Sequence, residues 1–238
     1  MKKQLIFYKG GRLRFVGHLD MMRTMHRAMT RADIPLSYSR GFNPHPHMSF
    51  SSPLALGCIG EREIMEFRLE KDMEDSLILE QLNAQLPQGL YVRGVRTLEE
   101  PSTPIMALVR VNEYRILFPE DLPAMEVFEQ LTSQPEITIT KLGKIHGRKQ
   151  QIRVDIKPLI ESYHWENPHT LVLLAAGGSE TNLKPELLLE QLYILMGCPE
   201  RQHEESISRS RAFGRTEEGA LYDLTDISSW ECTASWQP

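Results

Sequence analysis

Cysteine is scarce in this 238-residue chain, and its scarcity excludes several kinds of protein. Cys58, Cys198 and Cys232 are odd in number and far apart, so they form neither a disulfide framework nor a paired CxxC metal site. An iron–sulfur cluster is held by cysteines in close array, which this spacing does not provide. We therefore expect the chain to bind no metal and no cofactor of its own, and to work in a reducing cytoplasm.

Long apolar runs are also missing. The apolar stretch near the N-terminus is interrupted by Lys9, Gly10 and Gly11, too early for the core of a signal peptide. No other segment approaches the roughly 18 consecutive apolar residues that a membrane helix needs. We therefore expect a cytoplasmic protein without a membrane partner. With 41% apolar and 25% charged residues, the composition is near the globular average and allows two domains.

Charge is divided unevenly along the chain. The first 50 residues carry nine basic and two acidic side chains, a net charge of +7, whereas the whole chain carries −5, so the remainder carries −12. The charged residues of this segment are Lys2, Lys3, Lys9, Arg12, Arg14, Asp20, Arg23, Arg27, Arg31, Asp33 and Arg40. The asymmetry indicates an anionic partner, most commonly nucleic acid, unless these groups pair with the acidic remainder of the fold.

The first hundred residues predict six elements in the order strand, helix, strand, strand, helix, strand. Two β-rich runs flank Gly10-Gly11, a spacing that favours a tight hairpin. Pro35 and the stretch 41–47 cannot continue a helix and predict a rigid loop. The other expected elements are helices at 18–32 and 73–86 and strands at 48–56, 63–70 and 90–98.

A similar order of elements follows the prolines at 101 and 104. The expected strands are at 108–118, 136–142, 150–160, 170–176 and 207–213, and the expected helices at 121–132 and 184–197. We predict an α+β fold of tandem ferredoxin-like βαββαβ domains, the second degenerate. The predicted boundaries are a domain at 1–100, a linker at 101–105, a second domain at 106–215 and a tail at 216–238. We expect one sheet face to be free for ligands, and Trp230 and Trp236 to fray or dock on a partner.

Histidines are concentrated in the basic segment, where His18, His26, His45 and His47 accompany Asp20. An imidazole that titrates near neutrality suits general acid–base catalysis, so these five residues are the catalytic candidates. The alternative is that His26 packs in the core and the others make loop hydrogen bonds. No HExxH or similar spacing is present, and neighbouring arginines repel a dication, so we predict no metal site.

Several side chains in the same segment are typical of RNA binding. Arg23, Arg27 and Arg31 are four residues apart and form a basic stripe on the expected helix 18–32. In the rigid loop, Arg40 and Asn43 flank Phe42, whose ring either stacks on a base or fills the core. Further candidates for RNA contacts are Arg12 and Arg14 near the N-terminus, and Lys144 and Arg148 in a second basic loop, where solvated hairpin charges are the alternative.

The segment LRFVGHLDMMRTMHRAMTRADIPLSYSRGFNPHPHMSFSSPLALG resembles the radical-SAM-linked proteins, a bacterial family of unknown function. The resemblance extends through EREIMEFRLE and LNAQLPQGLYVRGVRTLEE, and loosely to ISRSRAFGRTEEGALYDL. It implies a partner, a radical SAM protein that carries the iron–sulfur cluster and S-adenosylmethionine. It also implies work on RNA or the ribosome, because genes of ribosomal proteins and ribonucleases often lie nearby. His47 departs from the family's loop, where arginine is usual.

Three functions remain open at this point. The first is an accessory protein that binds RNA or a ribosomal component through its basic N-terminal face for a radical SAM enzyme. The second is a metal-independent RNA-processing or RNA-modifying enzyme that uses one of the N-terminal histidines. The third is a protein–protein adaptor without nucleic acid. The missing cluster ligands favour an accessory protein over an enzyme.

Overall fold

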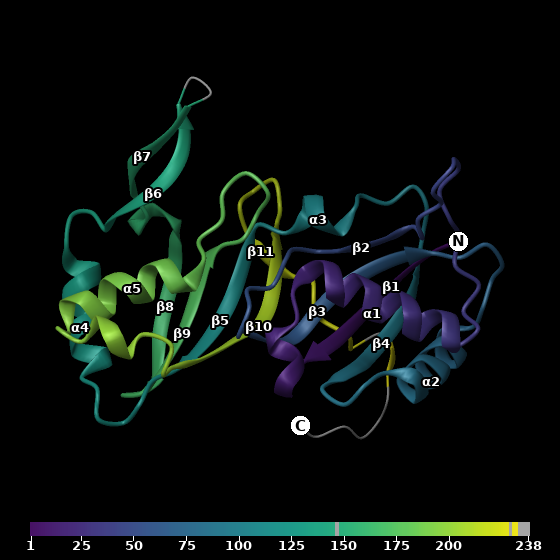
Figure 1. Ribbon diagram of the computed structural model, residues 1–238, viewed down its shortest axis with the longest axis horizontal. Coiled ribbons are helices and arrows are strands. Elements are labelled where there is room, and N and C mark those ends of the chain that lie inside the picture. The colour runs from purple at the N-terminus through teal and green to yellow at the C-terminus, as the bar shows by residue number, and fades with distance from the viewer. Residues whose placement is uncertain (146–147, 229, 233–238) are drawn as a thin grey trace. The chain divides into compact units, whose positions relative to one another are not determined.

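The computed structural model describes residues 1–145, 148–228 and 230–232 as a mixed α+β protein (Figure 1). Its packing divides the chain into a first unit, residues 1–110 with 208–238, and a second unit, residues 111–207. The α+β class is therefore confirmed. The predicted domain boundaries stay a prediction. Within the described part of the chain, no helix is both long enough and apolar enough to cross a membrane.

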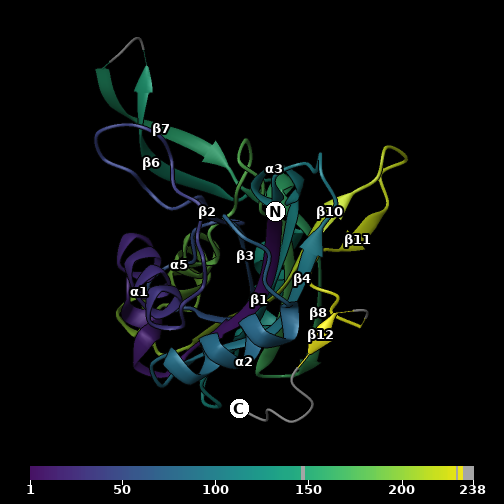
Figure 2. The same ribbon diagram turned by 90° about the vertical axis from the view of Figure 1, so that its right-hand side faces the viewer.

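The first unit is built on four antiparallel strands in the spatial order β4, β1, β3, β2. Their bounds are Leu90–Leu98, Lys2–Lys9, Ile59–Arg68 and Met48–Phe50. Helix α1, His18–Arg31, follows β1, and helix α2, Asp75–Gln85, precedes β4. Figure 2 shows both helices on one side of β1 and β3, with the short strand β11 on the other. The sequence predicts this order of elements correctly.

Side-chain alternation along β1 divides the first unit into two cores. Leu5 and Phe7 point toward the helices, where α1 buries Met21, Met25 and Met29. Because these helix positions are four residues apart, the arginines of α1 lie on a different face and remain exposed.

The opposite face of this sheet is covered around Ile6 and Ile64, which corrects the expectation that the whole face is free for ligands. Ile6 and Ile64 pack there against α3, Ile105–Leu108, and against Leu224 and Trp230 of the C-terminal segment. Strands β10 (Ser206–Arg215), β11 (Leu221–Asp223) and β12 (Glu231–Cys232) belong to this segment. Trp230 is only 8% exposed and lies under the Arg96 guanidinium, 4.2 Å from its ring centroid. Its indole therefore packs on this chain itself, and Trp236 lies outside the described residues.

The expected hairpin at Gly10-Gly11 is wrong. Gly11–Phe15 forms the 3-10 helix η1, and the partners of β1 are β3 and β4, both distant in sequence. Gly11 has a φ of +55°, and the Gly10 N–H donates to the carbonyl of Gly89 at 2.8 Å. Gly89 thus permits the close approach between the two loops, because a side chain there would collide with the Gly10 backbone, while Gly11 supplies the positive φ that η1 begins with.

The second unit has a sheet of β5 (Val111–Leu117), β9 (Thr170–Ala176) and β8 (Ile160–Asn167), antiparallel in that order. Helices α4, Ala124–Ser133, and α5, Pro185–Leu195, contribute buried Phe128, Leu188 and Tyr193. A separate hairpin consists of β6, Thr138–Ile145, and β7, Arg148–Asp155. The short 3-10 helices are η2, Lys157–Leu159, and η3, Pro199–Arg201. The single strand expected at 150–160 is divided. Its first part belongs to β7, which ends at Asp155, and β8 begins only at Ile160, because Pro158 lies in η2 and interrupts the ladder.

Candidate nucleic-acid interface

The basic residues of the N-terminal segment fall into a buried and an exposed group. Lys2 is 7% exposed and pairs with Glu66 at 3.0 Å, while Lys3 is 2% exposed and pairs with Asp75 at 2.8 Å. Lys9 is buried as well. The charge of +7 therefore overstates the exposed positive charge, and the arginines supply the remaining surface charge.

Helix α1 presents the row of exposed arginines that its spacing predicts. Arg23, Arg27 and Arg31 are all exposed and follow one another at one-turn intervals, about 6 Å apart along the axis. Arg23 pairs with Asp20 at 2.8 Å, in an exposed contact of the kind that contributes little stability. Arg31 donates to the carbonyl of Gln85 at 2.8 Å and so joins the end of α1 to the end of α2. Asp20, a catalytic candidate, thus has an arginine partner.

The loop after α1 is held at its base and exposed at its tip. The Ser39 N–H donates to the carbonyl of His45 at 2.8 Å, and the His45 N–H donates to Ser39 Oγ at 3.0 Å. Arg40 and Asn43 are exposed at the tip, and Phe42 has a relative exposure of 106%. The alternative in which Phe42 fills the core is wrong. An apolar ring is presented to solvent between a guanidinium and an amide.

Helix η1 adds a further cation and aromatic ring to the first unit. Arg12 is exposed, and the Arg14 guanidinium lies 4.8 Å from the ring centroid of Phe15, which is 62% exposed. An arginine over an aromatic face is an arrangement that nucleic-acid-binding proteins use for stacking. Sequence reasoning missed Phe15, because it counted this residue as part of a strand.

The four histidines are not brought together. His18 and His26 are separated by eight residues of α1, about 12 Å along the helix axis, too far to share a metal ion. His26 Nε2 lies 2.9 Å from the Tyr38 hydroxyl and links the helix to the loop, while His45 and His47 are exposed in the loop. Among the residues that the structure describes, no group of three or more His, Cys, Asp or Glu could hold a metal.

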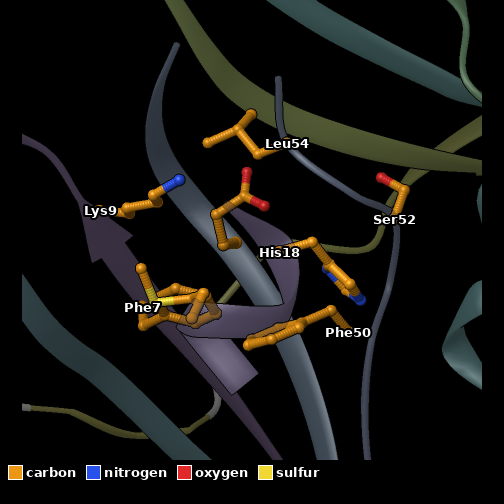
Figure 3. A pocket seen from close by; sticks show the side chains of 8 residues that line it. Phe7, Lys9, His18, Phe50, Ser52 and Leu54 are labelled. Atoms are coloured by element: carbon orange, nitrogen blue, oxygen red, sulfur yellow. The ribbon is translucent and has the colours of Figure 1, made fainter. Parts of the chain in front are cut away.

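His18 does border a small pocket at the start of α1, shown in Figure 3. Its ring meets Phe50 edge-on, with centroids 5.5 Å apart, and Ser52 and Leu54 form the adjacent wall. The free space is about 20 Å³, which holds roughly one water molecule. The pocket as it stands therefore has no room for a substrate of nucleotide size.

Charged groups that sequence reasoning missed lie beside this pocket. Glu63 accepts from Arg209 Nε at 2.9 Å, with both side chains 5% exposed. Lys9 Nζ donates to the carbonyl of Val16 at 2.8 Å. Burial lowers the pKa of Lys9, and the nearby Glu63 carboxylate opposes that shift. Because these residues are far apart in sequence, no motif spacing could have revealed the cluster.

The second basic loop lies in the hairpin of the second unit. The backbones pair Lys144 with Lys149 and Ile145 with Arg148 near the tip. The side chains of Lys144 and Arg148 lie outside what the structure describes, so their predicted contacts with RNA stay a prediction.

A comparison with protein families identifies a relationship over most of the chain. Residues 2–185 match the family model described as an uncharacterized protein conserved in bacteria (DUF2344). No curated protein matches the chain.

Proposed function

The chain belongs to the DUF2344 family of uncharacterized bacterial proteins, and we propose that it binds single-stranded RNA through its basic N-terminal face. This face is defined by η1, the exposed side of α1 and the loop 39–47. The proposal includes RNA segments of the ribosome. In it, the chain is an accessory protein that presents the RNA to a separate enzyme.

The observation that carries the proposal is the complete exposure of Phe42 on a loop fixed at its base. Leaving a phenylalanine ring in water has no benefit for folding, whereas an exposed ring stacks on any unpaired base. The fixed base limits the entropy lost when the loop binds. Arg40 beside the ring supplies a charge for a neighbouring phosphate.

Single-stranded RNA explains this combination better than an acidic protein does. An acidic protein surface would use the arginines but gives no specific role to an isolated exposed ring. Unpaired bases need a stacking surface, and the backbone of RNA needs cations at intervals. The row on α1 and the ring on the loop supply these two features in one unit.

We further propose the tandem ferredoxin-like arrangement. The first unit has the antiparallel strand order β4, β1, β3, β2 with two helices, as that fold requires. The second unit carries β5, α4, β8, β9 and α5 in the matching chain order, with the hairpin β6–β7 inserted. The proposed sixth element of the second domain is β10, of which Ser206 and Ile207 belong to the second unit and residues 208–215 to the first.

The proposed enzyme partner is a radical SAM protein, which would supply the iron–sulfur cluster and S-adenosylmethionine. Support comes from the resemblance of the N-terminal motif and from the wide spacing of the cysteines in the sequence. Copurification of the two proteins after nuclease treatment tests a direct contact. If the two proteins copurify only when the RNA is intact, RNA connects them and they make no direct contact.

A second candidate function is RNA processing that uses His18, because this histidine is exposed beside charged Lys9 and Glu63. Incubation with RNA in chelator, comparing the natural chain with His18→Ala, distinguishes the two functions. RNA bound but unchanged over hours supports the accessory role. Cleavage that disappears in His18→Ala supports the enzyme.

Fluorescence anisotropy with a labelled, unstructured RNA tests the proposed binding. Stacking contributes about 1–3 kcal/mol per base, so Phe42→Ala is expected to raise Kd by roughly 5- to 150-fold. Ile194→Ala in α5 is the matched control, because Ile194 is also an exposed apolar residue, at 53%, but belongs to the second unit. Equal affinity of the natural chain and Phe42→Ala would contradict the proposal.

A further inference from the structure

A groove of about 350 Å³ lies at the base of the loop 39–47, on the sheet face opposite α1 and α2. Residues 46–49 form one side, and Ser102 and Pro104 of the segment before α3 form the other. The volume falls in the range of small-molecule sites in proteins. All the lining residues belong to the first unit.

The floor of the groove is a buried ion pair. Lys2 Nζ lies 3.0 Å from Glu66 Oε2, and the two side chains are only 9% and 4% exposed. Lys2 Nζ also donates to Ser102 Oγ at 3.1 Å, and Gln4 Nε2 lies 3.4 Å from the other Glu66 oxygen. An ammonium has three donors and a carboxylate about four acceptor sites, so both groups keep capacity for a ligand.

The walls and the rim of the groove differ from its floor. Pro46, Met48 and Pro104 supply apolar surface, and His47 and Arg68 supply imidazole and guanidinium groups beside the opening. Arg68 pairs with Glu100, but the two side chains are 47% and 40% exposed. Because such exposed pairs are weak, Arg68 is available to turn toward an anion.

We propose that this groove binds one guanine nucleotide of the RNA, an inference that rests on the proposed function and names a base for it. Guanine presents two adjacent donors, N1–H and the N2 amino group, next to the O6 acceptor. The Glu66 carboxylate accepts from the donors, and the Lys2 ammonium donates to O6. The phosphate lies at the rim, beside His47 and Arg68.

The position of the groove is consistent with the proposed RNA path. His47 lines the groove and ends the loop 39–47, whose tip carries Phe42. The His47 N–H donates to the carbonyl of Ser37 and the Arg68 N–H to the carbonyl of His47, so the loop base is fixed to β3. A strand that stacks on Phe42 can therefore continue toward the groove along one loop.

Calorimetric titration of the full chain with GMP tests the groove without RNA. Ser49→Phe places a ring in the groove and is expected to weaken GMP binding at least tenfold. Thr103→Phe is the matched control, since Thr103 is exposed next to the groove and does not line it. Glu66→Gln, which keeps the shape, is expected to remove the preference for GMP over AMP.

Three results would overturn the groove proposal. Ribose phosphate alone could bind as tightly as GMP, Ser49→Phe could bind GMP normally, or only a peptide could compete for the site. Thermal unfolding of each variant establishes that it is folded. GMP binding without RNA binding would refute the proposed function and leave the groove site, whereas RNA binding that Ser49→Phe does not affect would refute the groove alone.

Discussion

The strength of RNA binding should depend on salt to an extent set by the exposed arginines. In the described part of the N-terminal face, Arg12, Arg23, Arg27, Arg31 and Arg40 are exposed. For single-stranded nucleic acid, log K falls with log salt by about 0.7 per neutralised phosphate, so five contacts give a slope of about −3.5. Raising salt from about 50 to 200 mM should then weaken binding by roughly 100-fold.

The test variant replaces the three α1 arginines, Arg23, Arg27 and Arg31, with glutamine. Two contacts remain, so the slope should fall to about −1.4 and the same salt change should weaken binding only about 7-fold. Glutamine has a helix propensity close to that of arginine, so α1 should persist. The measurement is Kd by anisotropy at four or more salt concentrations.

The control for this experiment changes two exposed arginines outside the face. Arg110 and Arg215 lie in the segments that cover the opposite side of the sheet, and Arg110→Gln with Arg215→Gln should leave the slope unchanged. An equal slope for the natural chain and the α1 variant would refute the assignment of α1 to phosphate contacts. A slope near zero for the natural chain would refute RNA binding by charge altogether.

Three further predictions concern stability. Arg209→Ala should lower the free energy of unfolding by about 3 kcal/mol or more in urea, because it leaves Glu63 buried without its guanidinium partner; a loss below 1 kcal/mol would contradict this. Burial lowers the pKa of Lys9 below its usual 10.5. Between these two pKa values the unfolded chain binds more protons than the folded chain, so the free energy of unfolding should rise with pH. The natural chain should thus gain stability relative to Lys9→Met from pH 7 to 10, and a constant difference would refute the burial effect. Phe42→Ala should change stability by less than about 0.5 kcal/mol, since the ring touches no core, and a larger loss would mean that it supports the fold.

The order of elements could be predicted from the sequence where one face of an element is buried. The methionines of α1 repeat at helical spacing, and prolines end the neighbouring loops, so local pattern was sufficient there. The prediction of a hairpin at Gly10-Gly11 failed because a glycine that supplies a positive φ in a 3-10 helix looks the same in sequence as a glycine in a tight turn. The cover on the second sheet face could not be predicted, because Trp230 and Leu224 are more than 200 residues away in sequence from the β1 residue Ile6 that they cover.

The candidate site could be predicted only in part, for a similar reason. The exposed row on α1 follows from spacing within one helix, and the structure confirms that Arg23, Arg27 and Arg31 are exposed. The burial of Lys2 and Lys9 could not be predicted, because their acidic partners come from β3, more than 50 residues away. Counting charges along the sequence therefore identified the face but overestimated its charge.

Ultraviolet cross-linking followed by peptide mass spectrometry measures the contact between RNA and the N-terminal face directly. The chain should cross-link to unstructured RNA at peptides from residues 12–47, with Phe42 among the modified positions. Cross-links confined to other parts of the chain, or none at a protein concentration well above the measured Kd, would contradict the account.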